Sequence, residues 1–281
     1  MAQAISEVIH DTDLEDWNLV GFGGFGNVFK AWHKTWGLHV AIKLPSHDSS
    51  QAEEKSLLKE ADHMKSLVFD FVLRIYGLYD GSPPFKGTTR LRGIVMEYMG
   101  RGSVETLQKT LAGPPPLPLA FRLAHQVALG INFLHLKGVL HQDLKPSNVL
   151  LTDELHVKLA DFGLSRITTS VLNSSDKTAG DNGGTFSYMP PEALEDLSYK
   201  PSRSFDIYSY GILLWSIFTG LEPYKGTNDS LVAFRIPKGD RPDVRLCPKN
   251  VEGMDELVEL MTQCWAGDPL KRPNSEGSQE K

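Results

Sequence analysis

The chain has 281 residues, enough to bury a substantial core in one large domain or two modest ones. Its formal net charge of -6 gives no basic stripe for nucleic acid, although a local anion site remains compatible with it. Cys247 and Cys264 are too few for a disulfide framework and lack metal-ligand spacing. They favour structural thiols in a reducing compartment, so we expect a cytoplasmic protein. From the net charge we expect a protein that binds no nucleic acid.

Membrane association is not indicated by the sequence. The start "MAQAISEVIHDTD" lacks a basic region followed by an apolar one. The longest apolar stretch, "IYSYGILLWSIFTGL" after Asp206, is short for a span and carries polar residues. We interpret it as a buried helix and expect no membrane span.

Residues 17–98 read as strands around one helix. The strand segments are rich in β-branched and aromatic residues: "WNLVGF", "NVFKAWHK", "LHVAIKL", "VLRIYGLYD" and "LRGIVMEY". Between the third and fourth, residues 52–68 show helical spacing, with an apolar stripe of Leu57, Ala61, Met64 and Val68. Glu60 falls on the edge of this stripe, where a carboxylate should have a partner.

After "MGRGS" the pattern becomes mainly helical. In "FRLAHQVALGINFLHLKG" one face gathers Ala124, Val127, Ala128, Ile131 and Leu134. The P-x-x-P of "AGPPPLP" comes just before this helix and favours a rigid connector over a peptide ligand. The sequence therefore predicts an α+β protein, with a small antiparallel β lobe that has one helix and a larger, mainly helical lobe.

Glycines cluster in "LVGFGGFGNVFKAWHK", where Gly21, Gly23, Gly26 and Val28 fit G-x-G-x-x-G-x-V. Such backbone can fold over the phosphates of a nucleotide. A dinucleotide-binding motif would need a helix directly after the glycines, whereas "NVFKAWHK" reads as a strand. By itself the motif leaves a plain glycine hairpin open as an alternative.

The segment "VAIK" adds a second signal. Ala41 and Lys43 point to the same face of a strand, so the small residue leaves room for a flat base and the ammonium can reach phosphates. Glu60 would pair with this lysine. The alternative is an exposed strand lysine and a solvated helix carboxylate.

The helical half contains "HQDLKPSNVLL", "KLADFGLS" and "PPE", in the expected order and spacing after the glycine loop, VAIK and the helix glutamate. The chain therefore resembles the catalytic domain of eukaryotic protein kinases from about Trp17 to Arg272. The resemblance implies an N-terminal extension (1–16), a catalytic domain (17–273) and a polar tail (274–281). Within the domain it implies an N-lobe (17–97), a hinge (97–101) and a C-lobe (102–273).

The resemblance also implies roles for individual residues, with ATP and Mg²⁺, or Mn²⁺ in its place, as cofactors. Asp143 would accept the hydroxyl proton, Lys145 would steady the transferring phosphate, and Lys43, held by Glu60, would bind the α- and β-phosphates. Asn148 and Asp161 would ligate the metal. The nucleotide would contact Gly21, Gly23, Gly26, Val28, Ala41, Lys43, Met96, Glu97 and Met99.

Further matches are expected to be structural. Glu192 and Arg272 resemble the ion pair that anchors the activation segment, and Asp206 resembles the aspartate that fixes the catalytic loop. Thr185 would help to hold Asp143 and Lys145. A hydrophobic spine is implied for Met64, His141 and Phe162, although simple core packing is the alternative for each.

Gln142 departs from the common pattern, in which an arginine precedes the catalytic aspartate. Glutamine brings no charge, so we expect activity not to depend on an arginine–phosphate switch. The segment 164–189 still offers hydroxyls for phosphorylation at Ser165, Thr168, Thr169, Ser170, Ser174, Ser175 and Thr178. After "KRP" the apolar helix implied by the resemblance is not found; its loss would expose core, so we expect reduced stability.

A finer resemblance is to the receptor-interacting protein (RIP) serine/threonine kinases of the tyrosine-kinase-like group, with features that lean toward the necroptosis-driving member. It rests on "GGFGNVFKAWHKTWGLHVAIK", "GIVMEYMGRGS", "SNVLLTDELHVKLADFGLS", "GGTFSYMPPE" and "SFDIYSYGILLW". It implies phosphorylation of protein Ser/Thr, including autophosphorylation, in innate-immune, inflammatory or cell-death signalling. Its implied partners are protein substrates, other RIP-type kinases or adaptors, and a second copy in a homodimer. The alternative is a nucleotide-regulated switch or scaffold with little turnover.

Overall fold

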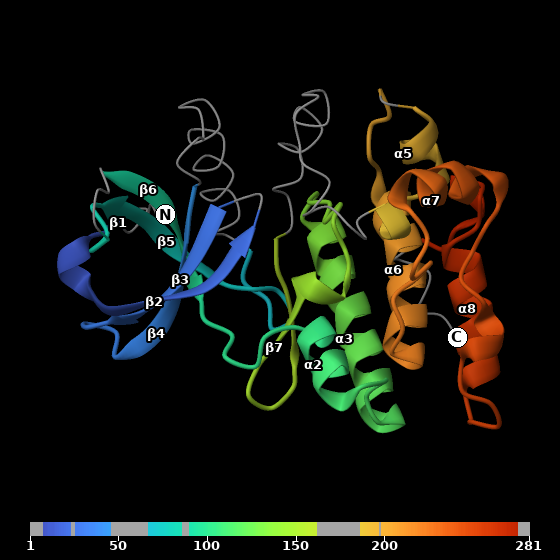
Figure 1. Cartoon of the computed structure of the whole chain (residues 1–281), viewed down its shortest axis with the longest axis horizontal. Coiled ribbons are helices and arrows are strands. Elements are labelled where there is room, and N and C mark those ends of the chain that lie inside the picture. The colour runs from blue at the N-terminus through green and yellow to red at the C-terminus, as the bar shows by residue number, and fades with distance from the viewer. Residues whose placement is uncertain are drawn as a thin grey trace. The chain divides into compact units, whose positions relative to one another are not determined.

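A computed structural model describes residues 8–23, 26–45, 67–85, 90–161, 186–196 and 198–274 (Figure 1). The chain divides into two compact units, Met1–Gly100 and Arg101–Lys281. The first contains a large β-sheet and the second is mainly helical, which confirms the α+β prediction. The helix predicted around Glu60 and Met64 falls on residues outside the described part of the chain.

The first unit contains a six-stranded sheet in the order β1-β5-β6-β4-β3-β2. Its neighbouring strands are antiparallel except β1 and β5, which pair in parallel. The bounds are β1 Val8–Ile9, β2 Leu14–Gly23, β3 Gly26–His33, β4 Leu38–Leu44, β5 Ile75–Gly81 and β6 Leu91–Glu97, with a 3-10 turn η1 at Asp11–Asp13. The strand segments expected between residues 17 and 98 are all present. Residues 8–16, which belong to the expected N-terminal extension, also contribute to the sheet.

The sheet alternates buried and accessible side chains as a half-buried strand pattern requires. In β3 the buried positions are Gly26, Phe29, Ala31 and His33. Trp17 packs edge-on against Phe29 and Tyr79, with ring centroids 6.0 and 5.5 Å apart. The core beneath the sheet consists of Ile9, Leu14, Phe29, Ala31, Val40, Ile42, Leu44, Tyr79 and Val95.

The second unit is built from helices and one short hairpin (Figure 1). The helices are α2 Val104–Leu111, α3 Leu117–Leu136, α5 Pro191–Glu195, α6 Arg203–Thr219, α7 Asp229–Arg235 and α8 Met254–Cys264. The hairpin pairs β7 Val149–Leu151 with β8 Val157–Leu159. Short 3-10 turns are η2 Pro146–Asn148, η4 Phe186–Tyr188, η5 Ile236–Lys238, η6 Val244–Leu246 and η7 Pro269–Lys271.

Helix α6 is buried on all sides from Phe205 to Phe218, which confirms the interpretation of the longest apolar stretch. Helix α3 packs against α6 and β8. Its predicted inward face is buried at Ala124, Val127, Ile131 and Leu134, whereas Ala128 is partly accessible. Among the described helices, α3 alone has the length and apolar composition to cross a membrane. Because α3 packs within this unit, its apolar composition is that of a core helix.

Candidate functional site

The loop at residues 141–148 brings together the predicted catalytic carboxylate and two of its expected partners. Asn148 Nδ2 donates to the Asp143 carbonyl oxygen at 2.7 Å and to Asp143 Oδ2 at 2.8 Å. Lys145 Nζ lies 3.0 Å from the same Oδ2, and the side chains of Lys145 and Asp143 are 23% and 21% exposed. A carboxylate oriented by two donors is therefore within reach of a ligand from solvent.

Asp206 of α6 fixes the backbone of this loop. Its Oδ1 accepts from Gln142 N at 2.7 Å, and its Oδ2 accepts from His141 N at 2.8 Å. Its Oδ2 also lies 2.8 Å from His135 Nε2 in a fully buried contact. Gln142 has φ 66°, a left-handed conformation that persists in a non-glycine residue only when its surroundings enforce it. The role expected for Asp206 is confirmed.

The His141 ring is fully buried under the loop. Burial lowers the pKa of His141, although the nearby carboxylates of Asp206, Asp143 and Asp161 oppose this shift. The Asp143 backbone N–H donates to His141 Nδ1 at 3.4 Å, so a neutral ring suits this contact. The other expected spine residues, Met64 and Phe162, lie outside the described residues.

The two predicted metal ligands lie at one end of the β7–β8 hairpin. Asn148 directly precedes β7, and Asp161 follows β8 by two residues. Ala160 N donates to the Asn148 carbonyl at 2.9 Å, which ties these two ends together. Since both donations to Asp143 come from Asn148 Nδ2, its Oδ1 is left as the side chain's acceptor.

This donor set fits a hard cation that prefers oxygen ligands. Within the described residues no three His, Cys, Asp or Glu side chains form a metal-binding group. A cation held by Asn148 and Asp161 would thus take its remaining ligands from phosphates and water.

Cys247 and Cys264 are free and buried, and burial raises the pKa of Cys264 to about 12, as expected for structural thiols.

In the first unit, β4 places Ala41 and Lys43 in the middle of the sheet. Lys43 pairs in register with Val28 of β3 and Ile94 of β6. Lys43 is 6% exposed, so the alternative of an exposed strand lysine is wrong. Its expected partner, Glu60, lies outside the described residues.

The glycine segment forms an antiparallel pair of strands, β2 and β3. Gly21 lies opposite Val28, and Gly23 lies opposite Gly26. Gly26 has φ +117°, and a Cβ there would overlap the Leu44 carbonyl oxygen, so only glycine fits. A strand follows the glycines directly, which excludes the dinucleotide-binding alternative. The hairpin itself leaves phosphate binding as a proposal.

The predicted adenine-side residues lie at the end of β6 and just beyond it. Met96 pairs in register with Ala41 of β4. The backbone N–H of Glu97 donates to the Arg74 carbonyl at 2.9 Å, and Met99 follows outside any regular element. Met96, Glu97 and Met99 are all partly accessible.

Gly93 is a structurally important position that the sequence motifs do not indicate. A Cβ at this β6 position would overlap the Lys43 carbonyl oxygen and come within 2.7 Å of Leu44 Cδ2. Gly93 therefore allows the close approach of β6 to the strand that carries Lys43. The available signal was a lone glycine inside the strand-like "LRGIVMEY".

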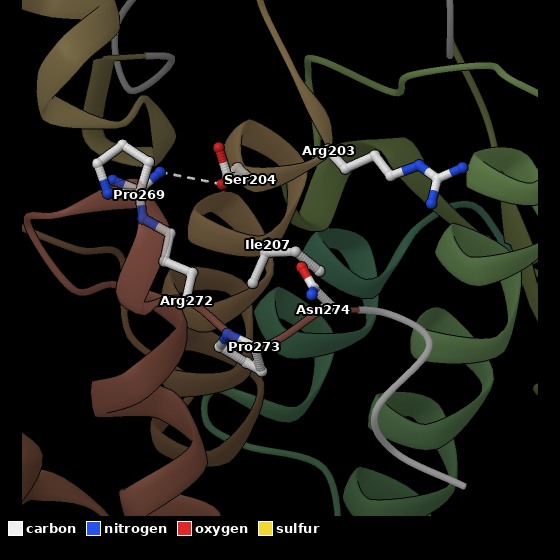
Figure 2. Close-up of a pocket in the computed structure, with 7 residues that line it drawn as sticks. All are labelled: Arg203, Ser204, Ile207, Pro269, Arg272, Pro273 and Asn274. Carbon is white, nitrogen blue, oxygen red and sulfur yellow. Dashed lines mark hydrogen bonds between the residues drawn. The ribbon is translucent and has the colours of Figure 1, made fainter.

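The predicted ion pair between Glu192 and Arg272 is present. Arg272 Nη1 and Nη2 lie 2.6 and 2.8 Å from the two carboxylate oxygens of Glu192. Nη1 also donates to the Ser204 carbonyl at 3.0 Å, the contact drawn in Figure 2.

The pocket shown in Figure 2 contains no predicted catalytic or nucleotide-binding residue. It is lined by Arg203, Ser204, Ile207, Pro269, Arg272, Pro273 and Asn274. Thr185 and the hydroxyls expected at 165–178 lie outside the described residues.

Comparison with known families gives a match over nearly the whole chain. The profile of the protein tyrosine and serine/threonine kinase family matches residues 14–280. The chain belongs to the protein kinase family. Kinase domains of this family use ATP and a divalent cation, which agrees with the oxygen donors described above.

This kinase domain is similar to several receptor-interacting kinases. It is 39% identical to human receptor-interacting serine/threonine-protein kinase 3, over 93% of the chain and 49% of the relative. It is 36% identical to human receptor-interacting serine/threonine-protein kinase 4, over 99% of the chain and 32% of the relative. It is also 36% identical to mouse ankyrin repeat and protein kinase domain-containing protein 1, over 92% of the chain and 34% of the relative. The resemblance to RIP-type kinases is thus confirmed, and the chain spans between a third and a half of the length of these relatives.

Proposed function

We propose that this chain transfers the γ-phosphate of ATP to serine or threonine hydroxyls of proteins, including its own. The observation that carries the proposal is the environment of Asp143. Its carboxylate is oriented by Asn148 Nδ2 at 2.8 Å and Lys145 Nζ at 3.0 Å, and stays partly exposed. These are the features that a base for an incoming hydroxyl requires.

Each side chain has a distinct task in this reaction. Asp143 would accept the hydroxyl proton while Lys145, beside it, would counter the negative charge of the transferring group. Asp206 would keep Asp143 in place, since it holds the backbone N–H groups of the two preceding residues. Lys145, two residues after Asp143, is typical of the serine/threonine branch.

The nucleotide would be bound as Mg-ATP, with Mn²⁺ as an alternative cation. Asn148 and Asp161 would hold the cation, which neutralises charge on the phosphates when it is bound. Gly21, Gly23, Gly26 and Val28 would lie over the phosphates, and Lys43 with Glu60 would bind them. The adenine would contact Ala41, Met96, Glu97 and Met99.

Similarity to RIP-type kinases supports a role in inflammatory or cell-death signalling. The partners would be protein substrates, other RIP-type kinases or adaptors, and a second copy of the chain. We place this activity in the cytoplasm, as the similarity to receptor-interacting kinases implies and as the two unpaired, buried cysteines of the chain suit. The boundaries of the catalytic domain at 17 and 273 stay a prediction.

Intact mass after incubation with Mg-ATP tests the proposal. The unmodified chain should gain phosphate, whereas Asp143→Asn should gain none, because the amide cannot accept the proton. Equal gain in both chains would reject Asp143 as the base. No gain in either, with ATP still raising the melting temperature, would favour the nucleotide-regulated switch instead.

A further inference from the structure

Gln126 of α3 is a polar residue buried on the apolar face of its helix. The buried residues of this helix include Ala124, Val127, Ile131 and Leu134. Gln126 is buried with them and is only 6% exposed. A buried amide is costly unless its polar atoms are hydrogen-bonded. Both ends of this amide are used, and both partners belong to the β7–β8 hairpin.

The oxygen Oε1 accepts from the Val157 backbone N–H at 2.9 Å. Nε2 lies 2.7 Å from His156 Nδ1, and it is the donor because an amide nitrogen has no acceptor. Val157 is the first residue of β8, so the amide attaches the start of this strand to α3. The contact joins residues 31 apart in sequence.

The same hairpin carries the two metal-ligand candidates at its other end. Asn148 precedes β7 and Asp161 follows β8, and the register pairs Val149 with Leu159 and Leu151 with Val157. Each of these strands has only three residues, so few ladder bonds resist a displacement of β8 along β7. Such a displacement would move Asp161 relative to Asn148.

We propose that Gln126 is a positioning residue for the metal site, because it fixes β8 and thereby the spacing of Asp161 from Asn148. This inference rests on the proposed function only in taking Asn148 and Asp161 as the ligands. Supporting groups of this kind orient ligands without touching the cation.

The readout is nucleotide binding, which requires no turnover. Calorimetry would give the affinity for a nonhydrolysable ATP analogue, with Mg²⁺ and with a chelator. The ratio of the two affinities measures the contribution of the cation. In Gln126→Leu we expect this ratio to fall about tenfold, with the affinity in chelator unchanged. Gln126→Glu, which keeps an acceptor for Val157 N–H, should restore most of the ratio.

Arg122 provides a matched control on the same helix. It is exposed, and among the described residues it donates to the carbonyls of Glu154 and Leu155 in the hairpin turn, at 3.2 and 3.4 Å. Arg122→Ala should leave the ratio unchanged, because its longer, exposed contacts reach only the turn and their loss leaves the hydrogen bond from Val157 N–H to Gln126 in place. Equal losses in Arg122→Ala and Gln126→Leu would overturn the proposal.

A structural role alone would lower the melting temperature of Gln126→Leu and leave the ratio at the unmodified value, and that result would also overturn the proposal. If Gln126→Leu does not fold, His156→Ala replaces it, since His156 is exposed and its ring orients the amide. His156→Ala should lower the ratio by a smaller factor than Gln126→Leu. An unchanged ratio in His156→Ala would contradict the proposal. An unmodified chain without any Mg²⁺ effect would overturn the inference. An unmodified chain with the effect but without phosphate transfer would contradict only the proposed function.

Discussion

The carboxylate of Asp206 has no exposed surface and accepts the backbone N–H groups of His141 and Gln142. Hydrogen bonds to a buried charged acceptor are stronger than neutral ones, because both partners have lost their contacts with water. They hold Gln142 in its left-handed conformation, one residue before Asp143. A single side chain thus determines the backbone on which the proposed base is mounted.

Asp206→Asn should therefore destabilise the fold and slow catalysis. One carboxylate oxygen becomes an NH₂ group that faces a backbone donor, so we expect a loss of about 1.5–3 kcal/mol in the free energy of unfolding. Urea denaturation measures this loss, and the phosphate-transfer rate should fall with it. Asp196→Asn is the control, because Asp196 is exposed and its partners are Ser198 N and Oγ. Equal effects of the two substitutions would contradict the argument.

At the scale of elements, the β4–β6 pair depends on a close approach beside Lys43. Tyr79 and Gly93 pair across β5 and β6, and Ile94 pairs with Lys43 across β6 and β4. At Gly93 the missing side chain leaves room for the Lys43 carbonyl and the Leu44 side chain. The packing of a buried sheet leaves little space for an added methyl group.

Gly93→Ala should destabilise the protein by about 1–3 kcal/mol, because the new methyl overlaps backbone that cannot move aside freely. Urea denaturation would give the change. Gly113→Ala serves as the matched control, since an added Cβ there meets no atom within 4 Å. A Gly93→Ala chain as stable as the control would show that β4 and β6 separate without cost.

Over the whole chain, Arg272 connects segments that are far apart in sequence. Its guanidinium contacts Glu192 of α5, the Ser204 carbonyl of α6 and the Ala266 carbonyl after α8. The Arg272 side chain has no exposed surface, and it lies 5.1 Å from the centre of the Tyr208 ring. Its planar group satisfies several acceptors at once, which a lysine cannot do.

Arg272→Ala should cost about 3–5 kcal/mol of stability, because it leaves Glu192 without its charge partner in a mostly buried place. Arg272→Lys should recover only part of this loss, since one ammonium cannot bridge both carboxylate oxygens. Arg245→Ala is the control: the ion pair of Arg245 with Asp243 is largely exposed and should contribute little. The melting temperatures of the three variants test the predicted ranking, in which Arg272→Ala loses most stability, Arg272→Lys less and Arg245→Ala least. A loss in Arg245→Ala as large as that in Arg272→Ala would refute it.

Local patterns in the sequence predict the strands between residues 17 and 98, the buried helix around Asp206 and the order of the catalytic motifs. These features follow from local patterns, since the alternation of side chains and the positions of glycine are set by near neighbours. Resemblance to kinases also predicted the role of Asp206 and the pairing of Glu192 with Arg272. It did not indicate β1, because Val8–Ile9 is too short to show a period. One prediction stays open: because Gln142 replaces the usual arginine, activity should not depend on a phosphate paired with this position.

Three features become visible only in the folded chain: Lys43 is buried, Gly93 allows the approach of β6, and Gln126 holds β8. No local pattern can supply these facts, because each depends on a partner from another part of the chain. In "AHQVAL" a glutamine on a helix reads as a solvated side chain. Packing of α3 against β8 buries it, and the need to satisfy its amide then makes it a link to the hairpin.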